Sequence, residues 1–135
     1  MSSSIGLSPE IVDALRHLKE RREINTVILR HTYTPGALAL DSEGNLTHDE
    51  LMRALPTDEA RLVVHELAFA TQEGARRHEH LLILWVPSGV STTEEQSYAD
   101  DYSSLKEFLT EVHIHLSVRR TEQLDYRQLV AQATG

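Results

Sequence analysis

The 135-residue chain contains no cysteine. It can form no disulfide framework and offers no thiol for catalysis, which fits a reducing compartment. Long apolar runs are also missing, because the six residues 81–86 fall far short of the ~20 that a membrane-spanning helix needs. The first residues lack the basic and apolar regions of a signal peptide. We therefore expect a cytoplasmic protein that does not insert into membranes.

Positive charge is scarce relative to negative charge. The chain has 13 Lys and Arg against 21 Asp and Glu, a formal net charge of −8. This balance repels a phosphate backbone, so nucleic acid is disfavoured as a partner. With 40% hydrophobic and 25% charged residues the composition is that of an ordinary globular protein. We expect a short N-terminal arm, residues 1–4, and one domain over residues 5–133.

The motifs that usually carry catalysis are absent from the sequence. It has no nucleophile elbow, phosphate loop or dinucleotide fingerprint, and its HELAF and HDELM segments lack the second histidine of a zincin helix. Asp100 and Asp101 are adjacent on an expected helix and point ~100° apart, so they cannot act as a paired acid and base. The sequence therefore predicts a protein that is not an enzyme and has no cofactor.

Histidines are the remaining candidates for a metal site. His113 and His115 alternate on an expected strand, and His78 and His80 lie in an expected loop. Alternate histidines on an edge strand are more often solvated, and no cysteine or clear carboxylate completes a zinc site. Asp41, Glu43 and Asn45 are spaced like the first ligands of a calcium loop. We reject such a loop, because the glycine that it requires is displaced and the glutamate that should close it is missing. We predict no metal.

The most informative stretch is a buried strand followed by a long helix. Residues 81–86 are all apolar and are closed by Pro87 and Gly89, as in a strand covered on both faces. A capping box, either Thr92 with Glu95 or Thr93 with Gln96, then predicts the start of a helix of ~17 residues.

This helix is expected to have one apolar and one polar side. Residues spaced by four, three and four place an apolar stripe on its inner side: Tyr98, Tyr102, Leu105 and Leu109. The opposite side carries Thr93, Gln96, Asp100, Ser103 and Glu107. Because polar side chains cover it, this outer side is the best candidate for a binding surface.

The remaining elements follow from local signals. Ser8 and Pro9 predict a first helix, with Ile11, Leu15 and Leu18 on its apolar side. Residues 24–33 and 37–41 predict a hairpin that turns at 34–36, and Thr47 with Glu50 predicts a capping box for a short helix. A strand over 60–70, a polar loop over 71–80, a strand over 112–118 and a final helix capped by Thr121 complete the chain.

The order of these elements predicts an α/β (α+β) fold. Hairpins pair neighbouring strands antiparallel, whereas a helix between the strands at 81–86 and 112–118 implies a parallel pair. The result is a mixed sheet of five or six strands. Helices must cover both of its faces, because the strand at 81–86 is apolar on both sides.

The ordered set of motifs resembles the actin-depolymerising factor homology (ADF-H) domain, of gelsolin-like fold, and within it glia maturation factor most closely. The resemblance covers nearly the whole chain. Its features are LRHLKERRE, LPTDEARLVV, the proline-ended strand, EQSYA in the long helix and VRRTEQLDYRQLV near the end.

The resemblance implies a module that binds actin or actin-related proteins through the N-terminal arm, the outer face of the long helix and the turn into the last helix. Carried over by position, the first surface comprises Ser2, Ser3, Ser4, Thr93, Glu95, Gln96 and Asp100, with Arg119, Arg120 and Glu122 at its edge. Arg76 and Arg77, near the tip of the loop at 71–80, belong to a second surface that meets a neighbouring actin subunit.

Two functions are compatible with the resemblance. Cofilins carry basic residues where this chain has Thr93, Glu95 and Gln96, and actin presents an acidic surface, so the face favours a glia maturation factor type that binds the Arp2/3 complex, promotes debranching and inhibits new branching. The alternative is a cofilin- or coactosin-like protein that binds or severs actin filaments. Either is expected to be a monomer at the cytoplasmic actin cytoskeleton.

Overall fold

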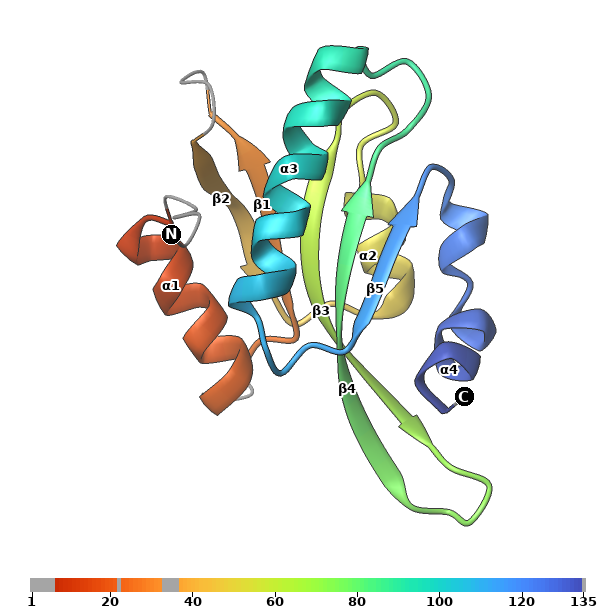
Figure 1. Ribbon diagram of the computed structural model, residues 1–135. Coiled ribbons are helices and arrows are strands. Elements are labelled where there is room, and N and C mark those ends of the chain that lie inside the picture. Colours follow the sequence, from red (N-terminus) through yellow and green to blue (C-terminus); the bar gives the residue numbers. More distant parts are fainter. Residues whose placement is uncertain (1–6, 22, 33–36, 135) are drawn as a thin grey trace.

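A computed structural model describes residues 7–21, 23–32 and 37–134. In chain order the elements are α1 (Pro9–Arg16), η1 (His17–Arg21), β1 (Thr26–His31), β2 (Leu38–Gly44), α2 (His48–Ala54), β3 (Arg61–Ala70), β4 (Arg76–Trp85), α3 (Thr92–Phe108), β5 (Ile114–Val118), η2 (Thr121–Leu124) and α4 (Tyr126–Thr134). The strands form one sheet in the order β2-β1-β3-β4-β5. All neighbours are antiparallel except β4 and β5, which are parallel (Figure 1). The predicted mixed sheet is confirmed.

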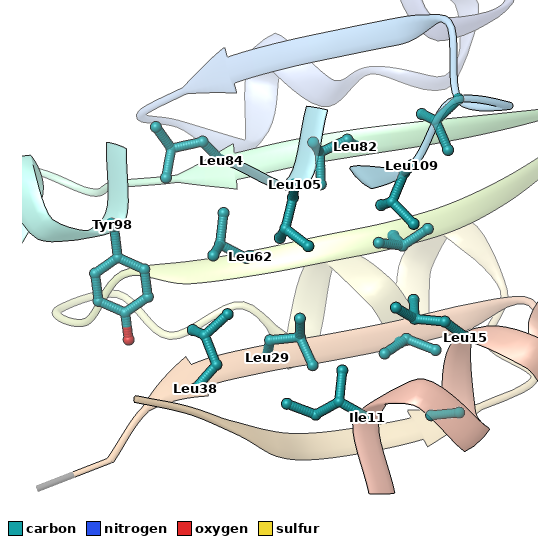
Figure 2. Packing of buried hydrophobic residues seen from close by; sticks show 14 of the residues in the cluster. Ile11, Leu15, Leu29, Leu38, Leu62, Leu82, Leu84, Tyr98, Leu105 and Leu109 are labelled. Carbon is teal, nitrogen blue, oxygen red and sulfur yellow. The ribbon is translucent and has the colours of Figure 1, made fainter. Parts of the chain in front are cut away.

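Helices cover both faces of this sheet, as predicted. On one face α1 and α3 pack over a cluster that includes Ile11, Leu29, Leu62 and Leu105 (Figure 2). On the other face α2 and the C-terminal segment pack over a second cluster. Residues 62–64 alternate between the two clusters, because successive side chains of a strand point to opposite faces. Both faces of the central strands are thereby removed from water.

Two helix starts follow the predicted caps and a third does not. The Ser8 hydroxyl accepts from the Ile11 N–H, and Thr47 with Glu50 forms the capping box of α2. The two capping boxes predicted for α3 are wrong, because Ser91 is its N-cap and accepts a hydrogen bond from the Glu94 N–H. Glu95 is therefore released from capping.

The β3–β4 hairpin is longer than predicted. The polar segment 71–80 is not a loop throughout, since β4 begins at Arg76 and pairs with Ala70 of β3. Backbone pairing with β3 extends the strand through these polar residues, of which 76–78 are exposed and 79–80 are half-buried. Beyond the segments that pair with β1 and β5, this hairpin continues as a two-stranded arm (Figure 1).

The C-terminal elements also differ from the prediction. The last strand, β5, begins at Ile114 instead of at residue 112. Thr121 does not cap the final helix, because it opens the 3-10 turn η2, and α4 begins only at Tyr126. The extra turn brings Leu124 into the core, where it is fully buried.

Asp41, the first residue of the rejected calcium loop, lies at a bulge in β2. Ile28 pairs with Ser42 and Leu29 with Leu40, so Asp41 is the extra residue. Its carboxylate lies 3.4 Å from Nε of Arg30 and 3.7 Å from Nε of Arg61. Asp41 thus pairs with two guanidinium groups of the protein itself.

Candidate partner-binding surfaces

The outer side of α3 is the most exposed side of a helix that is otherwise fixed in the core. Thr93, Gln96 and Asp100 are exposed, whereas Tyr98 is 2% exposed and Leu105 is fully buried. The predicted division into an inner and an outer side is therefore confirmed. Glu95 is half-buried, and the Gln96 amide donates to Asp100 Oδ1 over 3.0 Å, a spacing of one helical turn.

Tyr98 anchors α3 to the end of β1. Its hydroxyl accepts a 2.8 Å hydrogen bond from the His31 N–H, and its ring stacks on the His31 imidazole with centroids 3.8 Å apart. Burial raises the pKa of Tyr98, and the hydrogen bond from His31 opposes that rise. His31 Nε2 also lies 2.5 Å from Asp101 Oδ2. Asp101 thus faces the strand, while Asp100 remains on the outer side.

A groove lies beside the first turns of α3. It has a volume of about 500 Å³ and runs between the end of β1, the segment before β3 and the start of α3. The residues that line it include Arg30, His31, Arg61, Thr93 and Glu94. The groove is large enough to receive side chains from a docked protein.

The turn between β5 and η2 joins this surface directly. Arg119 and Arg120 are exposed on it, and Glu122 is exposed on η2. Arg119 Nη2 donates to Glu95 Oε2 over 2.6 Å, which links the turn to α3 across 24 residues of sequence. The structure therefore brings together the predicted residues of α3 and those of the turn. We define this combination, residues 93–100 of α3 with residues 119–122, as the α3 surface.

The other predicted arginines lie far from the α3 surface. Arg76 and Arg77 are exposed on the arm of the β3–β4 hairpin, which projects at the opposite end of the molecule from the start of α3 (Figure 1). They lie in β4 and not in the loop, which corrects the prediction. Arg77 pairs with Glu79 over 2.6 Å and places its guanidinium 5.6 Å from the Phe69 ring centroid. The predicted Ser2, Ser3 and Ser4 lie outside the described residues.

Besides the Glu95–Arg119 and Tyr98–His31 contacts, three contacts of these surfaces were not predicted from the sequence. The His31–Asp101 pair and the hydrogen bond from the Tyr126 hydroxyl to Ala68 O join residues 70 and 58 positions apart, for which the sequence offers no signal. The third is the Gln123 side chain, which accepts from the N–H groups of Arg119 and Arg120. Its spacing of three residues from Arg120 is that of a side chain that closes a turn.

The described residues form neither a metal site nor a membrane-spanning helix. No group of three or more His, Asp or Glu side chains among them is arranged to hold a metal ion. No helix of the described ranges has both the length and the hydrophobicity to cross a membrane. His115 is exposed on β5, and His113, the residue just before that strand, is also exposed. The candidate sites in the described part of the chain are therefore two exposed surfaces, the α3 surface and the arm of the β3–β4 hairpin.

A mixed five-strand sheet between helices, with a long helix exposed on its outer side and a projecting hairpin, is the architecture of the ADF-H fold. The model of the family described as cofilin/tropomyosin-type actin-binding protein matches residues 4–134. The chain belongs to this family. Its members are actin-binding proteins and not enzymes.

Curated relatives and solved structures agree with this assignment. The chain is 22% identical to actophorin of Entamoeba histolytica, over 96% of this chain and 95% of that protein. It is also 22% identical to actin-depolymerizing factor 2 of Oryza sativa, over 98% of this chain and 92% of the relative. The crystal structure of Streptomyces griseoflavus cofilin has a TM-score of 0.85 at 18% identity, covering 97% of this chain and 98% of that one.

A coactosin structure extends the same likeness. Coactosin from Entamoeba histolytica has a TM-score of 0.76 at 17% identity, covering 90% of this chain and 88% of that one. At such identities the structures establish the fold alone. The particular closeness to glia maturation factor is not shown by these relatives and stays a prediction.

Proposed function

We propose that the protein binds actin in the manner of a cofilin or coactosin, with the α3 surface as its main contact. The observation that carries the proposal is the division of α3 into two sides. Tyr98 and Leu105 hold the helix in the core, and its outer side is exposed to solvent. Family membership supplies actin as the partner. Such a protein acts on the actin cytoskeleton in the cytoplasm.

The second contact is proposed for the arm of the β3–β4 hairpin. Its exposed Arg76 and Arg77 are basic residues in a chain of net charge −8, so the arm suits an acidic partner surface. Because the arm and the start of α3 lie at opposite ends of the molecule, one copy can contact two neighbouring subunits of a filament (Figure 1). We expect the arm to matter for filaments and not for single actin subunits.

A bulky residue on the outer side of α3 tests the first contact. Gln96→Trp should weaken binding to actin at least about ten-fold, because the indole separates two surfaces that otherwise pack closely. Gln128→Trp is the matched control, since Gln128 is also exposed on a helix but lies on α4. Binding is measured by titration of fluorescently labelled actin monomers and by cosedimentation with bare filaments. Equal loss in both variants, or loss only in the control, contradicts the proposal.

The second candidate is the Arp2/3 complex, as in the glia maturation factor type. The favouring observation is the charge of the α3 surface, where the acidic residues Glu94, Glu95, Asp100 and Glu122 outnumber the basic residues Arg119 and Arg120. Acidic side chains slow encounter with an acidic actin surface. A branched-network assay separates the two: debranching without loss of bare filaments favours Arp2/3, whereas fast severing of bare filaments rules it out as the main activity.

A further inference from the structure

Three segments meet at the edge of the α3 surface through side-chain contacts. Glu95 comes from the first turns of α3, Arg119 from the turn after β5, and Gln123 from η2. Arg119 Nη2 lies 2.6 Å from Glu95 Oε2, and Arg119 N lies 2.7 Å from Gln123 Oε1. Arg119 is thus held at both its guanidinium and its backbone.

Gln123 acts here as a hydrogen-bond acceptor. Its Oε1 accepts from the N–H of Arg119 over 2.7 Å and from the N–H of Arg120 over 3.0 Å. The backbone completes the turn, since the Gln123 N–H donates to Arg120 O over 3.0 Å. A carboxylate at position 123 would offer the same acceptor, whereas alanine would leave both N–H groups to water.

Glu95 is suited to orient the arginine for two reasons. It lies in the first turn of α3, where the positive end of the helix dipole favours a carboxylate. Because Ser91 and Glu94 form the cap contact, Glu95 has no capping duty and can bind Arg119. The first turn of α3 and the turn after β5 are thereby joined.

The guanidinium that results is oriented but still accessible. The Arg119 side chain is 57% exposed, and one of its five N–H donors is directed at Glu95. An exposed ion pair contributes little to folding stability, so this arrangement has a small role in holding the fold. Its larger effect is that Arg119 loses rotamer freedom before a partner arrives, which reduces the entropic cost of binding.

We propose that Glu95 and Gln123 are positioning residues that present Arg119 to a carboxylate on the actin surface. The proposal rests on the proposed function, because it takes the α3 surface as the contact. A planar guanidinium with several unused donors fits a carboxylate with two acceptor oxygens. Arg119 is thus the receptor for an acidic side chain at the edge of a surface that is itself acidic.

A double-mutant cycle tests whether the two positioning residues act through Arg119. Glu95→Ala and Gln123→Ala should each weaken binding to labelled actin monomers about five-fold, and the double variant should be no weaker than about ten-fold, because both changes release the same arginine. Gln123→Glu should restore binding to within about two-fold, since the acceptor is kept. Asp49→Ala, an exposed acid on α2 and outside both proposed contact surfaces, is the control and should leave binding unchanged.

Separate outcomes report on the proposal and on the function beneath it. The positioning role is wrong, while actin binding stands, if the wild type binds and any of three results is found. Either the single substitutions do not change the affinity, or their fold-losses of affinity multiply fully in the double variant, or Gln123→Glu does not restore binding. If the wild type binds neither monomers nor filaments, the proposed function fails and the positioning role fails with it. Thermal unfolding of each variant, expected to match the wild type closely, excludes loss of fold as the cause.

Discussion

The α3 surface and the hairpin arm are built in opposite ways. Tyr98 and Leu105 fix α3 in the core, and His31, Asp101 and Arg119 link it to β1 and to the turn after β5. The arm is two strands that pair with each other, and the Tyr126 hydroxyl ties it to α4 through Ala68 O at 2.8 Å. One surface therefore depends on the whole core, whereas the other can change with little effect on the fold.

The largest effect is expected from shortening the side chain that anchors α3. Leu105→Ala leaves a cavity at a fully buried site and should lower the free energy of unfolding by about 3 kcal/mol. Chemical denaturation measures this change, and actin binding should weaken with it. Ser103→Ala, on the exposed side of the same helix, is the control. A loss below about 1 kcal/mol would mean that α3 is held mainly by its polar contacts.

Low pH should lower the free energy of unfolding through a buried histidine in β3, near the point where the hairpin arm leaves the five-strand sheet. His65 of β3 is 4% exposed and pairs with Thr26, the first residue of β1. Thr26 Oγ1 lies 2.8 Å from Asn25 Oδ1 and 2.9 Å from His65 Nδ1. Since the hydroxyl has one proton, which it donates to Asn25, His65 Nδ1–H must donate to Thr26.

Burial, with a smaller effect of His48, lowers the pKa of His65 from 6.5 to about 4. The unfolded chain therefore takes up the proton first. The stability due to neutral His65 is present above pH 6.5 and is lost as the pH falls towards 4, by up to about 3 kcal/mol. Urea unfolding at several pH values measures this slope. His65→Gln should flatten it, and an unchanged slope in that variant would assign the acid sensitivity to other groups.

A smaller effect is expected where the arm is tied to α4. Tyr126→Phe removes the hydrogen bond to Ala68 O and should cost about 1 kcal/mol or less, because the site is exposed. Amide exchange should accelerate in the arm, at residues 68–70 and 76–78, and stay unchanged in α3. Equal acceleration in both regions would show that the arm is not independent of the body.

The smallest change in stability should come from the arginines of the arm. Arg76→Ala with Arg77→Ala should alter the free energy of unfolding by about 0.5 kcal/mol or less, since both side chains are exposed. Filament binding should weaken several-fold, while binding to actin monomers should not change. Loss of monomer binding would place these residues in the first contact and remove the distinction between the two surfaces.

Local signals in the sequence predicted most of the fold. The spacing of Tyr98, Leu105 and Leu109 gave the buried side of α3, and Ser8 and Thr47 marked two helix starts, because these signals act over a few residues. The bounds of β4 were predicted less well. Pairing with β3 decides where that strand begins, and a polar sequence does not report its partner strand.

The candidate surfaces were predicted only in part. Exposure of Thr93, Gln96 and Asp100 follows from helix periodicity, but their role came from the family resemblance and stays a prediction. The Glu95–Arg119 contact and the role of Gln123 depend on how β5 and η2 lie against α3. Such contacts arise from tertiary structure and leave no periodic signal in the chain.

The most direct test of the account is protection of single cysteines by actin. Because the chain has no cysteine of its own, Gln96→Cys, Asp100→Cys and Gln128→Cys each give one reactive thiol. Alkylation rates are measured with and without saturating actin. The account predicts slower alkylation at positions 96 and 100 and no change at 128 on α4. Protection at 128 with unchanged rates at 96 and 100 would contradict it.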